Sequence, residues 1–286
     1  MKTKKKRNFW QIPVYAVLIF WALTTIYPLV WVGLNSFKVK NEIVANSFSL
    51  PVGELFTMSN YERAFDRVPI LGAYANSLII SGTVTVAVML LAGMAAFALT
   101  RYHFKGRNLL TTIVLASMMF PAFSTIVPVF RMEAAWGIVN TSDRLLSLLS
   151  CALPQIAGNL SFAIIVLSGY IRSLPLDLEE AAYLEGCNTP QIFTKVVVPL
   201  AKPSFATVAI FSFLWSYNDL FSQTFFLRIK PHWAITRLLK ELTAMEGTNY
   251  GLMAAAVTLV VVPVIILYAF LQKYIIKGMV AGAVKG

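Results

Sequence analysis

Long runs of apolar residues, separated by short polar segments, set the pattern of the whole chain. A helix needs roughly 20 consecutive apolar residues to cross the hydrocarbon core of a membrane, and six runs have this length. Helices are expected because backbone groups in lipid must be hydrogen-bonded within their own segment. The strict alternation of a β-barrel strand does not appear. The predicted spans are 12–37, 71–100, 108–130, 145–171, 204–227 and 250–272.

Composition supports the same fold class. Of 286 residues, 58% are hydrophobic and only 13% are charged, and the mean hydropathy is +0.70. Soluble domains carry about 25% charged residues, so a soluble globular enzyme is excluded. We therefore expect an all-α membrane protein with six transmembrane helices. One membrane domain would occupy residues 12–272, with a short segment at 1–11 and a tail at 273–286.

The basic opening MKTKKKRNFW and the apolar run after it raise the question of a signal peptide. The apolar run is longer than the 7–15 residues of a signal-peptide core, and no small-x-small cleavage site follows it. A retained first helix is the better interpretation.

Lysine and arginine predict the orientation, because cytoplasmic loops of membrane proteins are enriched in them. With the N-terminus inside, the inner segments hold 14 basic and 4 acidic residues, against 10 and 8 in the outer segments. We expect both termini in the cytoplasm. The net charge of +11 then reflects topology rather than a nucleic-acid site. The inner segments are 1–11, 101–107, 172–203 and 273–286, and the outer segments are 38–70, 131–144 and 228–249.

Motifs for catalysis or cofactor binding do not appear in the sequence. There is no G-x-x-x-x-G-K-[ST] phosphate loop, no H-E-x-x-H and no G-x-S-x-G. Cys151 and Cys187 are 36 residues apart, and their spacing suggests neither a disulfide nor a metal site. His103 and His232 fall on opposite sides of the membrane in this topology. The chain is expected to be no enzyme by itself and to need no cofactor or metal.

The inner segment 172–203 is the longest polar segment on the predicted inner side, and it contains four carboxylates. Asp177 is a candidate N-cap with Glu180 three residues later, and Gly186 can end the helix in the left-handed conformation. Thr189 then caps a second helix, which Pro199 is expected to stop. The segment therefore predicts a helix, a glycine turn and a second helix. The residues alone allow either an amphipathic connector on the membrane surface or a knob that docks on a soluble partner.

The sequence EAAYLEGCNTPQIFTKVVVPLAKP resembles the EAA loop of ABC-importer permeases. Two positions depart from the family pattern, because Glu185 stands where Asp is usual and Cys187 where Ala is usual. Both changes keep the charge or the small size, and the resemblance favours the docking interpretation. The positions in register are Glu180, Ala181, Ala182, Gly186, Phe193, Val196, Pro199 and Pro203.

A wider resemblance covers nearly the whole chain. The stretches NEIVANSFSLP, SNYERAF, NSLIIS, AFALTRYHFKGR and QKYIIKGMVAGAVKG are similar to the smaller, six-helix permease of maltose-type carbohydrate importers. The resemblance implies a multi-pass protein of the bacterial cell membrane that carries sugar. It also implies four kinds of partner: membrane lipid, a second permease, two ATP-binding subunits and an extracytoplasmic solute-binding protein.

The same resemblance implies that the first short helix sits in a cleft of the ATPase. Glu180 would offer its charge to a basic residue there, and Ala181 and Ala182 would allow close approach. Gly186 would set the angle between the two helices. The implied coupling residues are Glu180, Ala181, Ala182, Glu185, Gly186 and Pro199.

Polar residues within the predicted spans are the candidates for a substrate pathway. Gln155 and Asn159 share a helix face, where hydrogen bonding between helices is the alternative role. In the fifth span, Phe211, Trp215, Asn218 and Ser222 recur at helical spacing, and Asp219 follows Asn218. Rings and hydrogen-bonding groups suit a sugar. Asp219 could instead reach the outer interface or pair with Arg228.

Other functions remain open at this point. The chain could be an ABC permease for another solute, such as a peptide or polyamine. It could also be a secondary carrier that uses Asp219 as a proton site, because an ionisable residue in a span is costly. Such a carrier usually shows inverted repeats, which we do not find, and an EAA loop has no role in it. A membrane scaffold would not need that loop either.

Overall fold

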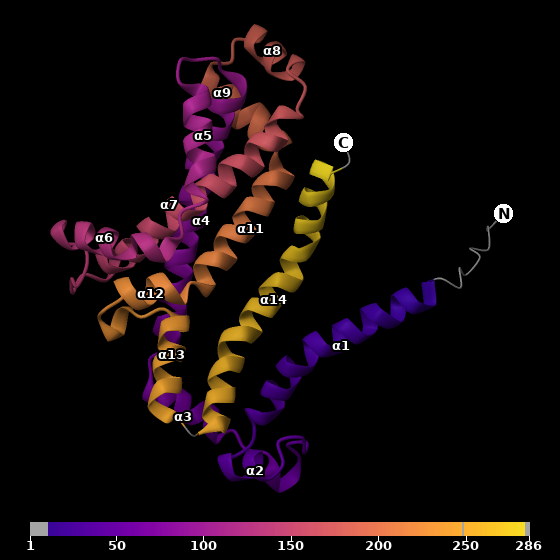
Figure 1. The fold of residues 1–286 in the computed structure, drawn as a ribbon, viewed down its shortest axis with the longest axis vertical. Helices are drawn as coiled ribbons and strands as arrows, with labels where there is room; N and C mark the ends of the chain where they lie inside the picture. Colours follow the sequence, from indigo (N-terminus) through magenta and orange to yellow (C-terminus); the bar gives the residue numbers. More distant parts are fainter. Residues whose placement is uncertain (1–10, 248, 284–286) are drawn as a thin grey trace. The chain divides into compact units, whose positions relative to one another are not determined.

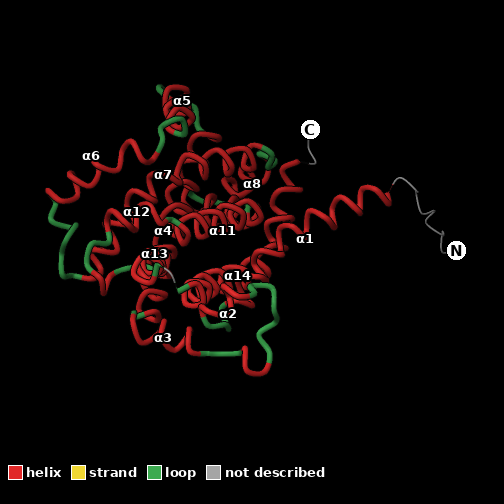
Figure 2. The backbone as a smooth tube through the Cα atoms, turned by 60° about the horizontal axis from the view of Figure 1, so that its bottom comes forward, coloured by secondary structure: helices red, strands yellow, loops and turns green. Residues whose placement is uncertain are grey.

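The computed structural model describes residues 11–247 and 249–283, and within them the chain is helical without any strand. Figures 1 and 2 show helices joined by short loops. The all-α class is therefore confirmed for this part of the chain. The principal helices are α1 (Gln11–Asn35), α2 (Lys40–Ala45), α3 (Ser59–Arg67), α4 (Ile70–Arg101), α5 (Arg107–Ser117), α6 (Ala122–Ala135), α7 (Arg144–Arg172), α8 (Asp177–Leu184), α9 (Thr189–Ile192), α10 (Val198–Leu200), α11 (Lys202–Asn218), α12 (Leu220–Phe226), α13 (Ile235–Glu246) and α14 (Tyr250–Ala283).

Four of the predicted spans are continuous helices within a few residues of the expected bounds. These are α1, α4, α7 and α14, and each is long and apolar enough to cross a membrane by length and composition. The last one continues past the predicted end at residue 272 to Ala283. Residues 1–10 and 284–286, which include most of the predicted N-terminal segment and the end of the tail, lie outside the described residues.

The third and fifth predicted spans are not single helices. Residues 108–130 are divided between α5 and α6, because Pro121 lacks the N–H that a continuing helix would use and has extended backbone dihedrals. Residues 204–227 are divided between α11 and α12 at Asp219, whose ψ of 81° leaves the helical region. The expectation of one uninterrupted helix at each place was wrong.

The structure separates into two compact units, which are described individually. The first comprises residues 1–68 and 239–262, and the second comprises residues 69–238 and 263–286. In the first unit, the buried Lys38 donates to the carbonyl oxygen of Ser47 at 3.3 Å and to the hydroxyl of Ser49 at 3.1 Å. Asn60 donates to the carbonyls of Ser36 and Lys38. These bonds fold the segment after α1 back on itself.

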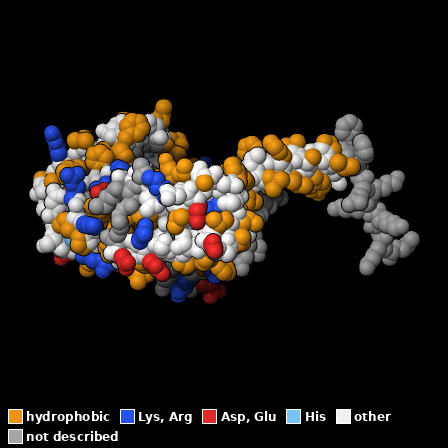
Figure 3. All heavy atoms as spheres, turned by 90° about the horizontal axis from the view of Figure 1, so that it is seen from below, with side chains coloured by type: hydrophobic (Ala, Val, Ile, Leu, Met, Phe, Trp, Pro, Cys, Tyr) orange, Lys and Arg blue, Asp and Glu red, His pale blue; other side chains and the backbone are white. Residues whose placement is uncertain are grey.

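The surface of α1 is apolar along its length. Its side chains are mostly more than half exposed, for example Phe20 at 69% and Trp21 at 71%, and Figure 3 shows hydrophobic atoms over this helix. A helix that is hydrophobic all round is typical of a membrane span.

Three long helices, α4, α7 and α11, pack together and form the core of the second unit (Figure 1). Val84 and Val88 of α4, Leu167 of α7 and Val208 of α11 are fully buried. At Gly93 the backbone of α4 approaches α11 so closely that a Cβ would lie 2.9 Å from the Phe205 ring. A small residue therefore permits this helix contact.

The first turns of α4 hold a loop of the same unit that precedes α13. The amide of Asn76 donates to the carbonyls of Pro231 and Trp233 at 3.1 and 3.0 Å. Its oxygen accepts from Arg144 at 2.8 Å. The hydroxyl of the next residue, Ser77, accepts from the N–H of Ile235. Asn76 thus joins α4, α7 and the loop that contains residues 227–234.

Candidate functional site

The polar segment after α7 begins a helix one residue earlier than expected. Asp177 was predicted to be the N-cap, but Leu176 already has helical dihedrals and its carbonyl accepts from the N–H groups of Glu179 and Glu180. Asp177 is therefore the first helical residue. Asp177, Glu179 and Glu180 all lie in the first turn, where negative charge interacts favourably with the helix dipole.

Gly186 ends α8 as predicted. Its φ is +84°, in the left-handed region that favours glycine. Its N–H donates to the carbonyl of Tyr183, and the N–H of Cys187 donates to the carbonyl of Ala182. This pair of bonds is the Schellman motif. The predicted glycine turn is confirmed.

The second short helix is capped by Asn188, where we expected Thr189. The side chain of Asn188 accepts from the N–H of Gln191, and the Gln191 side chain accepts from the N–H of Asn188, both within about 3 Å. This is a reciprocal capping box. Asn is at least as good a cap as Thr, and only the glutamine at the third position distinguishes the two candidates.

Pro199 was predicted to stop the second helix, but the helix continues past it. Residues Phe193–Val197 form a π-helical stretch, and α10 continues through Pro199 to Leu200. In the wider turn the N–H of Val198 bonds to the carbonyl of Phe193, so the hydrogen-bond ladder is already rearranged before the proline. The chain then bends by 82° into α11.

The predicted coupling residues share one exposed segment at an end of the second unit (Figure 1). Glu180, Ala181, Glu185, Gly186 and Pro199 are exposed, and Ala182 is partly exposed. α8 has no buried residue. The sequence interpretation missed two large apolar side chains on it, Tyr183 at 71% and Leu184 at 87% exposure. Such side chains on a short, otherwise acidic helix were the available signal of a contact surface.

A cavity of about 430 Å³ lies where the α5–α6 break faces α7, α11 and α12. Its wall contains hydroxyl groups, aromatic rings and aliphatic side chains, and among the described residues that line it none is charged. Of the predicted pathway residues, it brings together Trp215 and Ser222. The prediction missed its lining residues Ser117, Phe120, Thr125, Ser161, Phe162 and Phe221.

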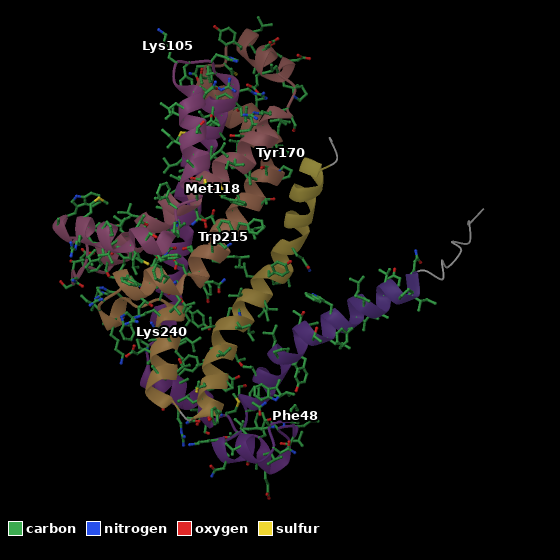
Figure 4. The ribbon with its side chains drawn as sticks, viewed as in Figure 1. Phe48, Lys105, Met118, Tyr170, Trp215 and Lys240 are labelled. Carbon is green, nitrogen blue, oxygen red and sulfur yellow. The ribbon has the colours of Figure 1, made fainter. Side chains whose placement is uncertain are left out.

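Trp215, which lines this cavity, belongs to an aromatic cluster. Its ring centre lies 4.9 Å from that of Phe162 and 5.7 Å from that of Phe211. The Trp215 side chain is 46% exposed. Figure 4 shows it close to Met118, which lies at the break between α5 and α6 and lines the same cavity. The hydroxyls of Ser117 and Ser161 bond to each other across this cavity.

Gln155 and Asn159 lie in helix contacts outside the cavity. The side-chain oxygen of Gln155 accepts from the hydroxyl of Ser216 at 2.5 Å and so links α7 to α11. Asn159 donates to the carbonyl of Gln155 in its own helix. Their geometry matches the alternative role of hydrogen bonding within and between helices.

Asn218 and Asp219 also have local roles. The amide of Asn218 donates to the carbonyl of Leu214 one turn earlier. The carboxylate of Asp219 accepts from the N–H of Ser222 and caps α12. Because the helix breaks here, Ser222 reaches the cavity through a turn, and the predicted continuous stripe with Phe211 and Trp215 does not exist.

Residues 88–281 match the family of the binding-protein-dependent transport system inner membrane component. The chain belongs to this family. It is a multi-pass inner-membrane protein and the permease of a binding-protein-dependent importer, and the resemblance to ABC-importer permeases is confirmed.

Individual relatives of this chain are also permeases, and they align with it over nearly its whole length. The chain is 33% identical to the diacetylchitobiose uptake system permease of Streptomyces coelicolor, over 94% of this chain and 87% of that one. It is 31% identical to the trehalose transport system permease of Mycobacterium tuberculosis, over 99% of both.

The fold also matches a solved structure. A chain in the crystal structure of a bacterial ABC transporter that imports the acidic polysaccharide alginate superposes with a TM-score of 0.77 and 25% identity. The match covers 96% of this chain and 99% of that chain.

Proposed function

We propose that this permease is half of the translocation pathway of an ATP-driven sugar importer and receives motion from ATPase subunits through α8. The observation that carries the proposal is the exposed α8, which presents Glu180, Tyr183 and Leu184 and buries none of its own residues. A helix of eight residues is marginal alone in water, so a partner that covers it is expected.

The proposed arrangement has six membrane crossings with both termini in the cytoplasm. Four crossings are α1, α4, α7 and α14, and a fifth is α11, which follows Thr189–Leu200 after a bend of 82°. The sixth is the broken pair α5 and α6. The excess of basic residues in the inner segments supports this orientation, which places α8 in the cytoplasm.

In this arrangement six coupling residues contact the cleft of the ATPase or hold the short helices in the orientation that reaches it. They are Glu180, Ala181, Ala182, Glu185, Gly186 and Pro199. Glu180 supplies charge, and the small Ala181 and Ala182 let the partner backbone approach. Tyr183 and Leu184 add apolar area at the end of the same helix. The complete importer would contain a second, different permease, two ATPase subunits and an extracytoplasmic binding protein.

The sugar substrate is supported by the relatives and by the cavity. Two relatives are permeases for diacetylchitobiose and trehalose, and the cavity offers rings beside hydroxyl groups. The C–H faces of a sugar pack on rings, while its hydroxyls need donors and acceptors. We place Trp215 and Ser222 on the pathway, with Phe162 and Ser161 facing them.

The test uses the permease reconstituted in liposomes with the second permease, the ATPase subunits and the binding protein. Diacetylchitobiose and trehalose serve as probes. Glu180→Lys reverses a charge toward the ATPase, and Gly186→Pro removes both the N–H that bonds Tyr183 and the positive φ. Both variants should insert normally but lose sugar-stimulated ATP hydrolysis by about tenfold or more.

Glu62→Lys is the matched control, because Glu62 is an exposed carboxylate on α3. It should keep stimulated hydrolysis at the wild-type rate. Wild-type stimulation in both the Glu180 and the Gly186 variants would refute the coupling assignment. A wild-type complex that hydrolyses ATP without any response to loaded binding protein would refute the proposed function itself.

A further inference from the structure

An ion pair joins the last residue of α4 to the first turn of α8. The Nε of Arg101 lies 2.7 Å from Oε1 of Glu179, and the two side chains are only 8% and 12% exposed. The same guanidinium donates to the carbonyl of Leu174 at 3.1 Å. Arg101 therefore holds both α8 and the turn that leads into it, although Glu179 is 78 residues away in the sequence.

Little else fixes α8 to the helical core. It contacts α9 and the π-helical stretch that follow it in the chain, and none of its residues is buried. A hollow of about 440 Å³ lies beside it, lined by Arg101, Tyr102, Glu179, Tyr183 and Ile192 among others. Arg101 and Glu179 both line this hollow. Their ion pair therefore connects α8 to α4 where side-chain packing is incomplete.

The two neighbouring glutamates of α8 have different surroundings. Successive residues in a helix are about 100° apart around its axis. Glu179 is therefore turned toward Arg101, whereas Glu180 is exposed. Both glutamates line the hollow beside α8. Glu179 is paired with Arg101 there, and the more exposed Glu180 is left for the partner.

The end of α4 also contacts the second half of the loop. The hydroxyl of Tyr102 bonds to the hydroxyl of Thr189 at 3.2 Å. The ring of Phe97 lies 5.4 Å from that of Phe193 in the π-helical stretch. The C-terminal end of α4 thus contacts three elements through three residues. Arg101 contacts α8, Tyr102 contacts α9 and Phe97 contacts the π-helical stretch.

We propose that Arg101 is a positioning residue that locks the coupling helix to α4 through Glu179, so that α8 and α4 move as one body. The proposal rests on the proposed function, since it concerns how ATPase motion enters the membrane domain. Without the pair, ATPase subunits would still bind the exposed face of α8. The helix would then shift against α4 instead of moving it.

The test measures two quantities on the reconstituted importer: ATP hydrolysis, and uptake of labelled diacetylchitobiose and trehalose. Arg101→Ala and Glu179→Ala should each lower sugar transported per ATP hydrolysed by about tenfold, while the ATPase subunits still co-purify. Arg101→Lys keeps the charge but cannot bond Glu179 and the Leu174 carbonyl with one planar group, so it should show an intermediate loss.

Arg107→Ala is the matched control. Arg107 is the first residue of α5, just after the turn that follows Arg101. It donates to the carbonyl of Leu99 at 2.7 Å, but it bonds no residue of segment 172–203. It should retain the wild-type ratio of transport to hydrolysis. A loss as large as that of Arg101→Ala would overturn the proposal, because any weakening of the turn between α4 and α5 would then suffice.

The double variant Arg101→Ala/Glu179→Ala distinguishes the loss of one shared interaction from two unrelated losses. If Arg101 acts through Glu179, the double variant should be no worse than either single variant. Losses that multiply, or a wild-type ratio in Arg101→Ala and Arg101→Lys, would overturn the proposal. In each of these outcomes the wild-type importer still couples, so the proposed function would stand.

Discussion

His232 lies in the loop that Asn76 holds, and its side chain is buried. Burial lowers the pKa of this imidazole, the nearby Arg144 lowers it further, and Asp143 acts in the opposite direction. Because the pKa is lower in the folded protein than the ordinary value of 6.5, the unfolded chain takes up a proton first as pH falls. The stability associated with neutral His232 is complete above that value and decreases below it.

We therefore expect the midpoint of thermal unfolding in detergent to be lower at about pH 5.5 than at about pH 7.5. His232→Asn should reduce this difference, since asparagine does not titrate. His103→Asn, at an exposed position of the turn between α4 and α5, should leave the difference unchanged. An unaltered difference in His232→Asn would show that other groups cause the pH dependence.

At the scale of elements, the contact of α4 with α11 depends on one glycine. A Cβ at Gly93 would lie 2.9 Å from the Phe205 ring and 3.3 Å from the Phe193 ring, so both would have to move. Gly82 lies on the same helix, and a Cβ there would meet nothing within 4 Å. The two positions differ in packing while sharing helical backbone.

Gly93→Ala should lower the free energy of unfolding by about 1–3 kcal/mol, the usual cost of overpacking. Gly82→Ala should be neutral or stabilising by up to about 1 kcal/mol, because alanine is the better helix former. Thermal unfolding in detergent compares them. Equal effects of the two substitutions would mean that the α4–α11 contact is not as close as described.

The length of apolar runs predicted the helices but not where they break. α4 and α7 were located to within one residue at each end, because each span needs a minimum apolar length. The break at Asp219 was not predicted, since Asp219 and Ser222 form a local cap inside an apolar run. Hydrophobicity is insensitive to such a cap.

The candidate sites were predictable to different degrees for a related reason. The α8–Gly186–α9 turn is encoded by neighbouring residues, so its form could be predicted, with an error of one residue at each helix cap. The cavity depends on α5, α6, α7, α11 and α12 meeting, and Ser117 and Ser161 are 44 residues apart. A single sequence contains no direct signal of which distant helices contact one another. The ion pair of Arg101 and Glu179 was missed for the same reason.

The proposed coupling role requires that α8 lies in the cytoplasm and is covered by an ATPase subunit. Cys187 directly follows Gly186 and is partly exposed, whereas Cys151 is fully buried in α7. Cys187 is thus a natural reporter of the coupling loop, and the buried Cys151 adds little background to thiol labelling. Glu54 is exposed in the predicted outer segment and offers a position for an opposite-side reporter.

The most direct measurement is labelling by a membrane-impermeant maleimide. In intact cells it should modify Glu54→Cys and not Cys187. In inside-out vesicles it should modify Cys187, and the rate should fall several-fold when the ATPase subunits are present. Labelling of Cys187 from outside the cell, or at the same rate with and without the ATPase subunits, would contradict the account.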